Sequence, residues 1–500
     1  MKLCDGMKIL YDTNILIHIQ DPKILSPDLQ ELLALIREHS HQEVIHPASL
    51  KDIENDNDAE RREMILSKLH GYPILPSPPQ PNDSFVSLVG TPSNSHDIND
   101  NEILYSLYKD LVDFIITEDK GIRRKAFRLD VDDRVFSISS ALDYFKRLYK
   151  RYEPKHTLLK QLYAHEIDID QPFFDSLKRD YTNFQQWWTE KCVKQSRKCW
   201  IYEEEGEIKG FLMLKEETEA IDTYPPQPIK SRVKITTLKV DLSGSKMGEL
   251  FLKIAFQYCI NNNFFEIYLT HFETNDDSLV YVIGNYGFEN IGKRTSNGED
   301  VYLKKFKVED TGLEPLTIAN RYYPCFKDDE NIKKFIIPIQ PDYHDTLFPD
   351  CSRRQLTFDD YTKINVPGNA IKKAYLSSSR ITKITPGSIV LFYRSRDQKA
   401  ITAVGVVDQD PIRTTDPAEL KRIVGKRSVY SDEELMGWTK KNVFVIPFKH
   451  HLYLPNPLNL NYLKEKGILK SHPQSITEIN HERYVALKSG GKLDERFTVN

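Results

Sequence analysis

Residues 8–19 read KILYDTNILIHI. A short apolar run stops at a turn-prone Asp-Thr-Asn, and a second apolar run then begins a helix. A similar order recurs at residues 113–129, where DFIITED ends in acid and KGIRRKAFRL begins another helix. Strand and helix alternate in this way, so we predict an α/β module with a parallel sheet over residues 1–150.

Four aspartates of this module stand where ligands of an α/β sheet gather, near the carboxyl ends of the strands. Asp12 follows the first strand, Asp52 lies on the helix after the second, Asp100 opens a later helix and Asp119 follows the strand of DFIITED. Carboxylates that share one pocket repel one another, and a hard cation such as Mg²⁺ or Mn²⁺ relieves the repulsion. Such a site can activate water for phosphodiester hydrolysis. Each aspartate taken alone is also explained as a helix cap or a surface acid.

The passages YDTNILI, HPASLKDIEND, NDNEIL and IITEDKGIRRKA resemble, in order and spacing, the four acidic motifs of PIN-domain ribonucleases. The resemblance implies that the catalytic, metal-binding residues are Asp12, Asp52, Asp100 and Asp119. It also implies support from Asn14 and Thr117.

Two positions in this comparison have alternatives. Asp52 stands where the family more often has glutamate, and Glu54 is close by. Residues 71–99, rich in Pro, Ser, Asn and Gly, predict a long loop, which leaves Asp97 as a substitute for Asp100.

Residues 151–308 form a second expected unit of mixed α/β sequence. Residues 199–217, CWIYEEEGEIKGFLMLKEE, predict a hairpin with Glu-Gly at its turn, and KITTLKVDL and GSKMGELFLKIA follow as strand and helix. This layout resembles a GNAT-type acetyltransferase. The resemblance implies an acetyl-CoA pyrophosphate on backbone N–H groups at the helix N-terminus. The implied cofactor contacts are Leu238, Val240, Ser243, Ser245, Lys246, Gly248 and Asn275.

The second unit also departs from that family. Ser243 and Lys246 replace the usual Arg/Gln and inner glycine of the pyrophosphate loop, although a lysine can pair with phosphate as a point charge. Ile283 stands where the family often has a tyrosine that protonates the departing thiolate. Glu266 and His271 are the candidates for a base.

The last 150 residues differ in charge from the rest of the chain. From Cys351 onward there are 25 Lys and Arg against 15 Asp and Glu. A basic surface of this kind suits a polyanion, although a solvated basic surface explains the counts equally well. Residues 309–350 are irregular and hold several prolines, so we expect a linker there.

The β-rich runs SIVLFYRS, KAITAVGVVD and NVFVIPF predict a small β-barrel with helices over residues 351–500. SSSRITKITPGSIVLFYRS and KAITAVGVV resemble the PUA-like barrels of the ASCH and EVE families. The resemblance implies a nucleobase pocket and a nucleic-acid surface made by Ser378, Arg380, Lys383, Arg394 and Trp438. The alternative is an ordinary barrel whose aromatic side chains are core.

Composition limits the class of protein and its expected location. The chain is 40% hydrophobic and 28% charged, and no apolar run approaches the ~18 residues of a membrane span. Its first residues lack a secretory signal, so we expect a cytoplasmic protein. The six cysteines lie far apart with no C-x-x-C pair, which fits reduced thiols.

Three functions follow from these observations. The first is a metal-dependent endoribonuclease, toxin- or defence-like, that acts on an RNA such as tRNA or mRNA, with an antitoxin as partner and a homodimer as a mild expectation. The second is an N-acetyltransferase that acts on RNA or protein. The third is a non-catalytic nucleic-acid-binding protein with a degenerate acidic site.

Overall fold

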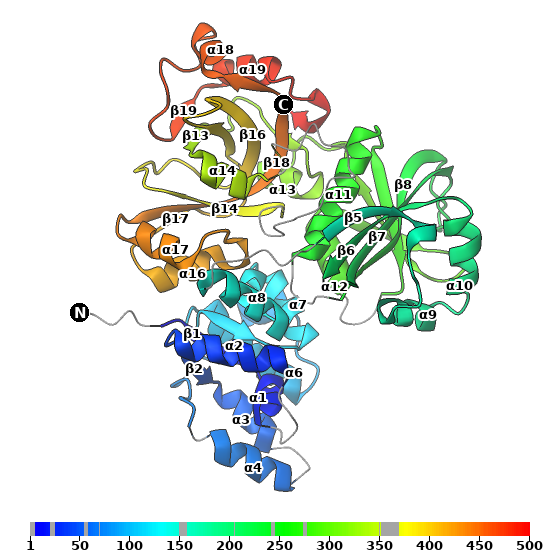
Figure 1. Ribbon diagram of the computed structural model, residues 1–500, viewed down its shortest axis with the longest axis vertical. Coiled ribbons are helices and arrows are strands. Elements are labelled where there is room, and N and C mark those ends of the chain that lie inside the picture. The colour runs from blue at the N-terminus through cyan, green and yellow to red at the C-terminus, as the bar shows by residue number, and fades with distance from the viewer. Residues whose placement is uncertain are drawn as a thin grey trace.

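A computed structural model describes residues 6–20, 26–54, 59–69, 71–149, 158–204, 206–241, 246–273, 278–349, 351 and 370–500. Three bodies are visible in Figure 1. The N-terminal module (blue to cyan) and the C-terminal module (yellow to red) lie at opposite ends of the long axis, and the middle module (green) lies to one side.

The N-terminal module contains the predicted parallel sheet. Its strands are ordered β2-β1-β3-β4, and every pairing is parallel. They are β1 (Lys8–Tyr11), β2 (Gln42–Ile45), β3 (Phe114–Ile116) and β4 (Val135–Phe136). The helices are α1 (Thr13–Gln20), α2 (Pro27–Glu38), α3 (Pro47–Glu54), α4 (Ala59–Leu69), α5 (Asp83–Val89), α6 (Ser95–Tyr108), α7 (Lys120–Arg128) and α8 (Ile138–Tyr149), with the short turn η1 (Asp132–Arg134).

The expected loop over residues 71–99 is partly helical. Asn82 caps α5 by accepting a hydrogen bond from the Phe85 N–H, and Asn94 caps α6 by accepting one from the Asp97 N–H. Asparagine is common both in loops and at helix N-caps, so composition alone did not distinguish a loop from the start of a helix. As a result, Asp100 does not open its helix but lies in the second turn of α6.

The middle module is built on a seven-stranded sheet, ordered β10-β11-β9-β8-β7-β6-β5. The predicted hairpin is present as β6 and β7, which pair antiparallel. The strands are β5 (Leu158–Tyr163), β6 (Lys198–Glu204), β7 (Glu207–Glu219), β8 (Lys230–Val240), β9 (Glu266–His271), β10 (Phe288–Lys293) and β11 (Asp300–Lys305). The helices used below are α11 (Met247–Asn261) and α12 (Ser278–Gly284).

The C-terminal module begins earlier than expected, and residues 309–350 are not a linker. They contain α13 (Pro315–Arg321), β13 (Lys334–Ile339) and α14 (Pro341–Leu347). β13 lies inside the sheet, parallel to β15 and antiparallel to β19. Two of the prolines that suggested a linker, Pro315 and Pro341, start the two helices, where proline is well tolerated.

The sheet of this module is ordered β14-β18-β16-β15-β13-β19, and β17 also pairs with β18. The prediction over residues 351–500 was a small β-barrel; within residues 370–500, no pairing joins β14 to β19, so strand pairing does not close this sheet. The strands are β14 (Lys372–Ser377), β15 (Ile389–Arg394), β16 (Ala400–Val407), β17 (Ile412–Thr414), β18 (Val443–Asn459) and β19 (Thr477–Ile479). The helical elements used below are α16 (Pro417–Val424), η6 (Gly425–Arg427) and α17 (Asp432–Thr439).

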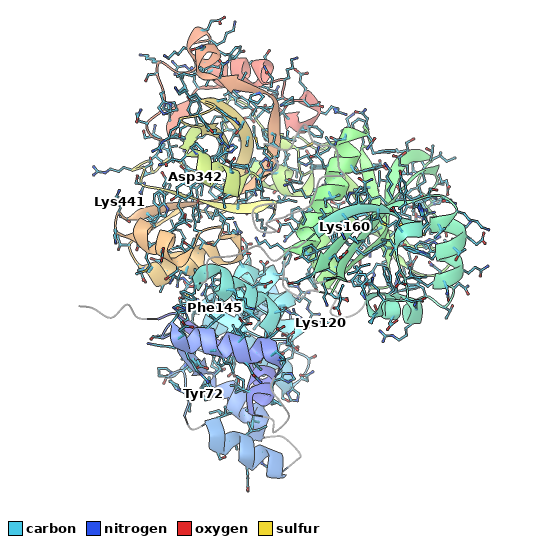
Figure 2. All side chains as sticks on the ribbon, viewed as in Figure 1. Tyr72, Lys120, Phe145, Lys160, Asp342 and Lys441 are labelled. Carbon is cyan, nitrogen blue, oxygen red and sulfur yellow. The ribbon has the colours of Figure 1, made fainter. Side chains whose placement is uncertain are left out.

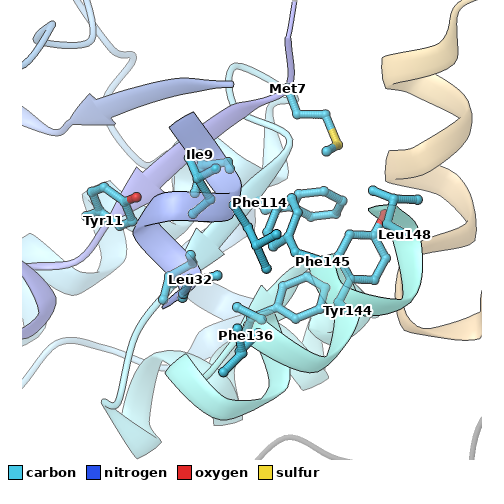
Figure 3. Close-up of a cluster of buried hydrophobic side chains, with 14 of the residues drawn as sticks. Met7, Ile9, Tyr11, Leu32, Phe114, Phe136, Tyr144, Phe145 and Leu148 are labelled. Atoms are coloured by element: carbon cyan, nitrogen blue, oxygen red, sulfur yellow. The ribbon is translucent and has the colours of Figure 1, made fainter. Parts of the chain in front are cut away.

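One hydrophobic cluster spans two modules. Buried side chains of β1, β3 and α8, including Phe145 and Leu148, share it with Leu420 and Val424 of α16 (Figure 3). Phe145 is labelled in Figure 2 at this boundary. The N-terminal and C-terminal modules are therefore joined by a common core, which fixes their relative position.

Candidate functional site

Two adjacent strands place Asp12 and Asp119 at the same edge of the sheet. Asp12 follows β1, and its N–H donates to the carbonyl of Ile116 on β3 at 3.1 Å. Asp119 lies three residues beyond β3 and caps α7 by accepting a hydrogen bond from the Ile122 N–H at 2.8 Å. Because β1 and β3 are parallel, both aspartates lie at the same edge of the sheet.

Asp12 is buried and firmly held. One carboxylate oxygen accepts the Thr13 N–H at 2.7 Å, and the other accepts Asn14 Nδ2 at 2.5 Å and Thr117 Oγ1 at 2.6 Å. Burial raises the pKa of Asp12 to about 6 against the lowering effect of these hydrogen bonds, and the charges of Asp119 and Asp52 raise it further. Asn14 and Thr117 thus contact the carboxylate that they were expected to support.

Asp100 shows that the four carboxylates lie near one another. Burial, followed by the charges of Asp12 and Asp119, raises its pKa to about 8. Lys125 lowers the pKa and Asp52 raises it. Asp12, Asp52 and Asp119 are therefore near enough for their charges to act on Asp100.

Asp52 is held by side chains from α6. Its Oδ1 accepts Asn99 Nδ2 at 2.6 Å and lies 3.1 Å from His96 Nδ1. The His96 side chain is 75% exposed, so this edge of the site is open to solvent. Neither His96 nor Asn99 was singled out in the sequence, because their role depends on α6 packing against α3.

The alternatives Glu54 and Asp97 point elsewhere. Glu54 is exposed at the end of α3. Asp97 forms an ion pair with Lys125 and accepts the Ser93 N–H at 2.8 Å. Asp52 and Asp100 are thus the members of each pair that face the other carboxylates.

A hard divalent cation fits this donor set chemically, because it consists of carboxylate oxygens with excess negative charge. Among the residues that the structure describes, however, no three His, Cys, Asp or Glu side chains are grouped as a metal cage. The site is therefore a loose acidic cluster.

Four of the seven residues expected around acetyl-CoA, Leu238, Val240, Lys246 and Gly248, lie in the described part of the chain. Ser243, Ser245 and Asn275 lie outside the described residues. Leu238 and Val240 end β8, beyond its pairing with β9, which runs from Val233 to Ile235. A Cβ on Gly248 would meet Val282 at 3.9 Å, so packing does not require glycine there.

Lys246 was expected to contact phosphate but is engaged by another module. Its Nζ lies 3.5 Å from Asp133 of the N-terminal module. Ile283 is buried in the core, and the nearby Tyr281 hydroxyl accepts a hydrogen bond from Arg128 Nη2 at 3.0 Å. Glu266 is paired with Arg232 at 2.6 Å, and its pKa is lowered, which argues against its use as a base near neutral pH.

The C-terminal module contains a pocket of about 610 Å³. Three residues predicted for nucleic-acid binding, Ser378, Arg380 and Trp438, line it. The other two do not. Lys383 pairs with Glu478 at 2.9 Å on the surface, and Arg394 is held by Asp397 at 2.7 Å and also by Asp345.

The pocket has further aromatic and polar lining residues that were not predicted from the sequence. The Tyr343 ring centroid lies 5.6 Å from that of Tyr430 and 6.4 Å from that of Trp438. The remaining polar and aromatic lining includes Gln340, Tyr375, Ser377, Ser379 and Gln474. Gln340 and Tyr343 were missed because they fall in the stretch expected to be a linker.

No protein-family model matches the chain, and no curated protein matches it. Solved structures similar to parts of it include an ASCH protein from Zymomonas mobilis, with 18% sequence identity and a TM-score of 0.25 over 31% of this chain and 94% of that one. Another is the PaiA N-acetyltransferase of Thermoplasma acidophilum, solved in complex with coenzyme A, with 15% identity and a TM-score of 0.23 over 30% of this chain and 98% of that one. At these scores the likenesses carry no argument about activity.

The described helices include none with the length and hydrophobicity needed to span a bilayer. No disulfide joins the described cysteines, which are Cys192, Cys199, Cys259, Cys325 and Cys351, and Cys4 lies outside the described residues.

Proposed function

We propose that the N-terminal module is a divalent-cation-dependent ribonuclease whose site consists of Asp12, Asp52, Asp100 and Asp119. One observation supports the proposal: Asp12 and Asp119 follow adjacent parallel strands at the same edge of the sheet, and their charges act together with that of Asp52 on Asp100. Such a cluster is a receptor for a hard cation, because the cation removes the repulsion. The choice of RNA rests on the resemblance to PIN-domain ribonucleases.

Neighbouring groups of the chain hold the carboxylates of the proposed site in place. Asp12 is oriented by the hydrogen bonds from Thr13, Asn14 and Thr117, and Asp119 is fixed by the first turn of α7. The exposed edge beside His96 leaves room for a phosphodiester to approach. A bound Mg²⁺ or Mn²⁺ would supply the Lewis acid that activates water and offsets charge on the phosphate.

The test is cleavage of tRNA, ribosomal RNA, messenger RNA and single-stranded DNA in the presence of Mn²⁺ or Mg²⁺. Asp12→Asn and Asp119→Asn are expected to lower the cleavage rate by at least ~10²-fold, because each removes a charged oxygen from the cluster. Chelation with EDTA is expected to abolish cleavage.

A matched pair of variants tests the assignment on α3. Asp52→Asn is expected to lose activity, whereas Glu54→Gln, two residues along the same helix and exposed, is expected to keep it. Cleavage that continues in EDTA, or that survives all three Asp→Asn changes, would rule out the proposal.

A second function is favoured by the pocket of the C-terminal module: binding of a flat nucleobase. Tyr343, Tyr430 and Trp438 offer ring faces for stacking. Ser377 Oγ accepts the Ser379 N–H at 3.1 Å, so its own O–H is left to donate to an oxygen of the ligand. Arg380 is exposed at the rim and suits a phosphate.

Fluorescence anisotropy of labelled short RNAs measures this binding. Trp438→Ala and Arg380→Ala are expected to weaken it about tenfold or more, because stacking contributes ~1–3 kcal/mol per base. Lys383→Ala is the control, since Lys383 pairs with Glu478 outside the pocket. Equal affinity in all three variants would locate RNA binding elsewhere.

Other expectations stay separate from these two proposals. Acetyl transfer is not included, because Ile283 and Tyr281 are engaged in packing and in an inter-module contact. An antitoxin partner and a homodimer are proposals that follow from the resemblance to PIN-type toxins, and a cytoplasmic location is a proposal that follows from the cysteine pattern, which fits reduced thiols. Sedimentation of the purified chain tests the dimer.

A further inference from the structure

The pocket of the C-terminal module has a wall in common with the core that this module shares with the N-terminal module. Leu376 and Tyr430 line the pocket, and both are buried members of the hydrophobic cluster that contains side chains of β1 and α8. Tyr343 and Trp438 also line the pocket and pack against the same cluster. A ligand in the pocket therefore contacts side chains of the cluster that joins the two modules.

Helix α17 connects the pocket to the module boundary. Trp438, near the end of the helix, lines the pocket, and Asp432, its first residue, forms an ion pair with Lys421 of α16. The Lys421 side chain is buried, and its Nζ lies 5.6 Å from the centre of the Tyr149 ring of α8. One short helix thus contributes to the pocket at one end and, at the other, holds a lysine that contacts the N-terminal module.

Tyr149 extends this set of contacts towards the N-terminal sheet. Its hydroxyl lies 2.7 Å from His41 Nε2, and His41 Nδ1 accepts the Met7 N–H at 3.2 Å. Burial lowers the pKa of His41 to about 3, and the charges of Lys421 and His39 lower it further, so the ring is neutral near neutral pH. Because Nδ1 is an acceptor, the ring proton is on Nε2 and is donated to the Tyr149 oxygen.

The contacts reach the strand that ends at the acidic site. Met7 immediately precedes β1, and His41 immediately precedes β2, which pairs with β1 along its whole length. Met7 also belongs to the shared cluster and is labelled in Figure 3. Asp12 is the residue directly after β1. A contiguous series of described contacts therefore runs from Trp438 in the pocket to Asp12.

Buried charge also fixes the position of one module on the other. Arg427 of η6, whose side chain is 1% exposed, donates to Asp133 of η1 at 2.6 Å. Together with the shared core, this ion pair leaves no freedom for a hinge between the modules. A ligand in the pocket can therefore act on the acidic site only through the order of the contacts between them.

We propose that the C-terminal pocket is an effector site for the acidic site. A nucleobase in the pocket strengthens divalent-cation binding by the four aspartates, through α17, Tyr149 and His41; the inference rests on the proposed functions of both sites. A base stacked on Trp438 restrains α17 and, with it, the contacts that hold the start of β1. The cation then binds to a sheet edge that is already ordered, so its binding costs less conformational entropy. By linkage, the cation strengthens base binding by the same factor.

Reciprocal titrations of the full chain test the coupling. Mn²⁺ binding is measured by calorimetry with and without saturating adenosine, guanosine, cytidine or uridine, and binding of each nucleoside is measured with and without Mn²⁺. Nucleosides are used because the phosphate of a nucleotide would itself bind Mn²⁺. For at least one nucleoside, both dissociation constants are expected to fall about fivefold or more when the other ligand is present.

A pair of Tyr→Phe variants tests the route. Tyr149→Phe removes only the hydroxyl that accepts from His41, so both ligands are expected to bind while the coupling factor falls to about half or less. Tyr72→Phe is the matched control. The Tyr72 hydroxyl accepts a hydrogen bond from Arg37 Nη2 at 3.3 Å, away from the series of contacts, so the coupling is expected to stay as in wild type.

Hydrogen exchange gives a measurement that needs no metal. In EDTA, the nucleoside that couples to Mn²⁺ is expected to slow exchange of the Met7 N–H, which His41 accepts, and of the Asp12 N–H, which the Ile116 carbonyl accepts. The same nucleoside is expected to leave both amides unchanged in Trp438→Ala. Exchange that is equally fast with and without nucleoside in wild type would contradict an ordering of β1.

The titrations separate this inference from the proposed functions on which it rests. If Mn²⁺ and a nucleoside both bind but neither changes the affinity of the other, the effector role is wrong and both proposed functions stand. If wild type binds no Mn²⁺, or no nucleoside, the corresponding proposed function fails and the effector role fails with it. Equal coupling in Tyr149→Phe and wild type would overturn the route through His41, and with it the proposal.

Discussion

At Asp100, the cost of burying a carboxylate is added to repulsion from three others. Its pKa of about 8 means that the folded protein keeps a proton that the unfolded chain, with an ordinary pKa of 3.8, releases. The folded state therefore binds more protons between about pH 4 and pH 8. In the absence of a divalent cation, stability is expected to fall as the pH rises through this window.

Asp100→Asn is expected to weaken that pH dependence, to which Asp12 with its pKa of about 6 also contributes, and to stabilise the metal-free chain at pH 8 by on the order of 1–2 kcal/mol. Asp97→Asn, three residues earlier on α6, is expected to destabilise it, because Asp97 is paired with Lys125. Thermal unfolding in EDTA between pH 5 and pH 8 measures both. A wild-type midpoint that does not change with pH would show that Asp100 is not protonated in the folded state.

Lys304 is the opposite case, because it is a basic side chain whose charged form is disfavoured by burial. Its ammonium donates to the Arg321 carbonyl at 3.2 Å and is fully buried beside the rings of Phe256 and Phe306. Burial lowers its pKa to about 7, with the charge of Lys449 adding to the effect. The unfolded chain binds the extra proton between pH 7 and about pH 10.5, so the stability that this residue affects rises with pH.

Lys304→Met is therefore expected to raise the melting temperature relative to wild type more at pH 6.5 than at pH 9.5. The loss of the hydrogen bond to Arg321 lowers stability equally at both pH values, so its effect cancels when the two values are compared. A difference from wild type that is the same at both values would contradict the assignment of a lowered pKa to Lys304.

At the scale of single elements, the start of α7 links helix capping to the proposed chemistry. A Cβ on Gly121 would come within 2.9 Å of Asp119 Oδ1. Gly121→Ala is expected to turn that carboxylate and to lower RNA cleavage about tenfold or more. The gain in helix propensity, about 1 kcal/mol, offsets the weakened cap, so the melting temperature is expected to change little.

Gly284→Ala, at the end of α12, is the control, since nothing lies within 4 Å of a Cβ there. It is expected to leave cleavage unchanged. If both glycine variants cut RNA as wild type does, the orientation of Asp119 is not important for activity.

Individual elements also show which parts of the fold could be predicted from the sequence. The strand–turn–helix units at Asp12 and Asp119 were predictable, because hydrophobic pattern, turn residues and acid coincide within a few positions. β13 was not, because it is stabilised by pairing with β15 and β19, which are distant in sequence. The ion pairs that occupy Lys246 and Arg394 were not predictable either, because a basic side chain has the same appearance in a sequence whether it is free or paired.

For the whole molecule, the cluster shared by β1, α8 and α16 predicts joint unfolding. Leu148→Ala is expected to cost about 2–5 kcal/mol and to lower the unfolding temperature of the N-terminal and C-terminal modules together. Met213→Ala, in a cluster confined to the middle module, is the comparison. Calorimetry with hydrogen exchange distinguishes the modules, and an N-terminal module that melts alone would contradict a common core.

This shared core has a consequence for any RNA that occupies both proposed sites at once. Because the shared core prevents the two modules from moving relative to each other, a constant number of nucleotides separates the recognised base from the cleaved bond. Sequencing of product ends would show cuts at one offset from a preferred base. Ends scattered at many offsets would mean that reading and cutting take place on separate strands.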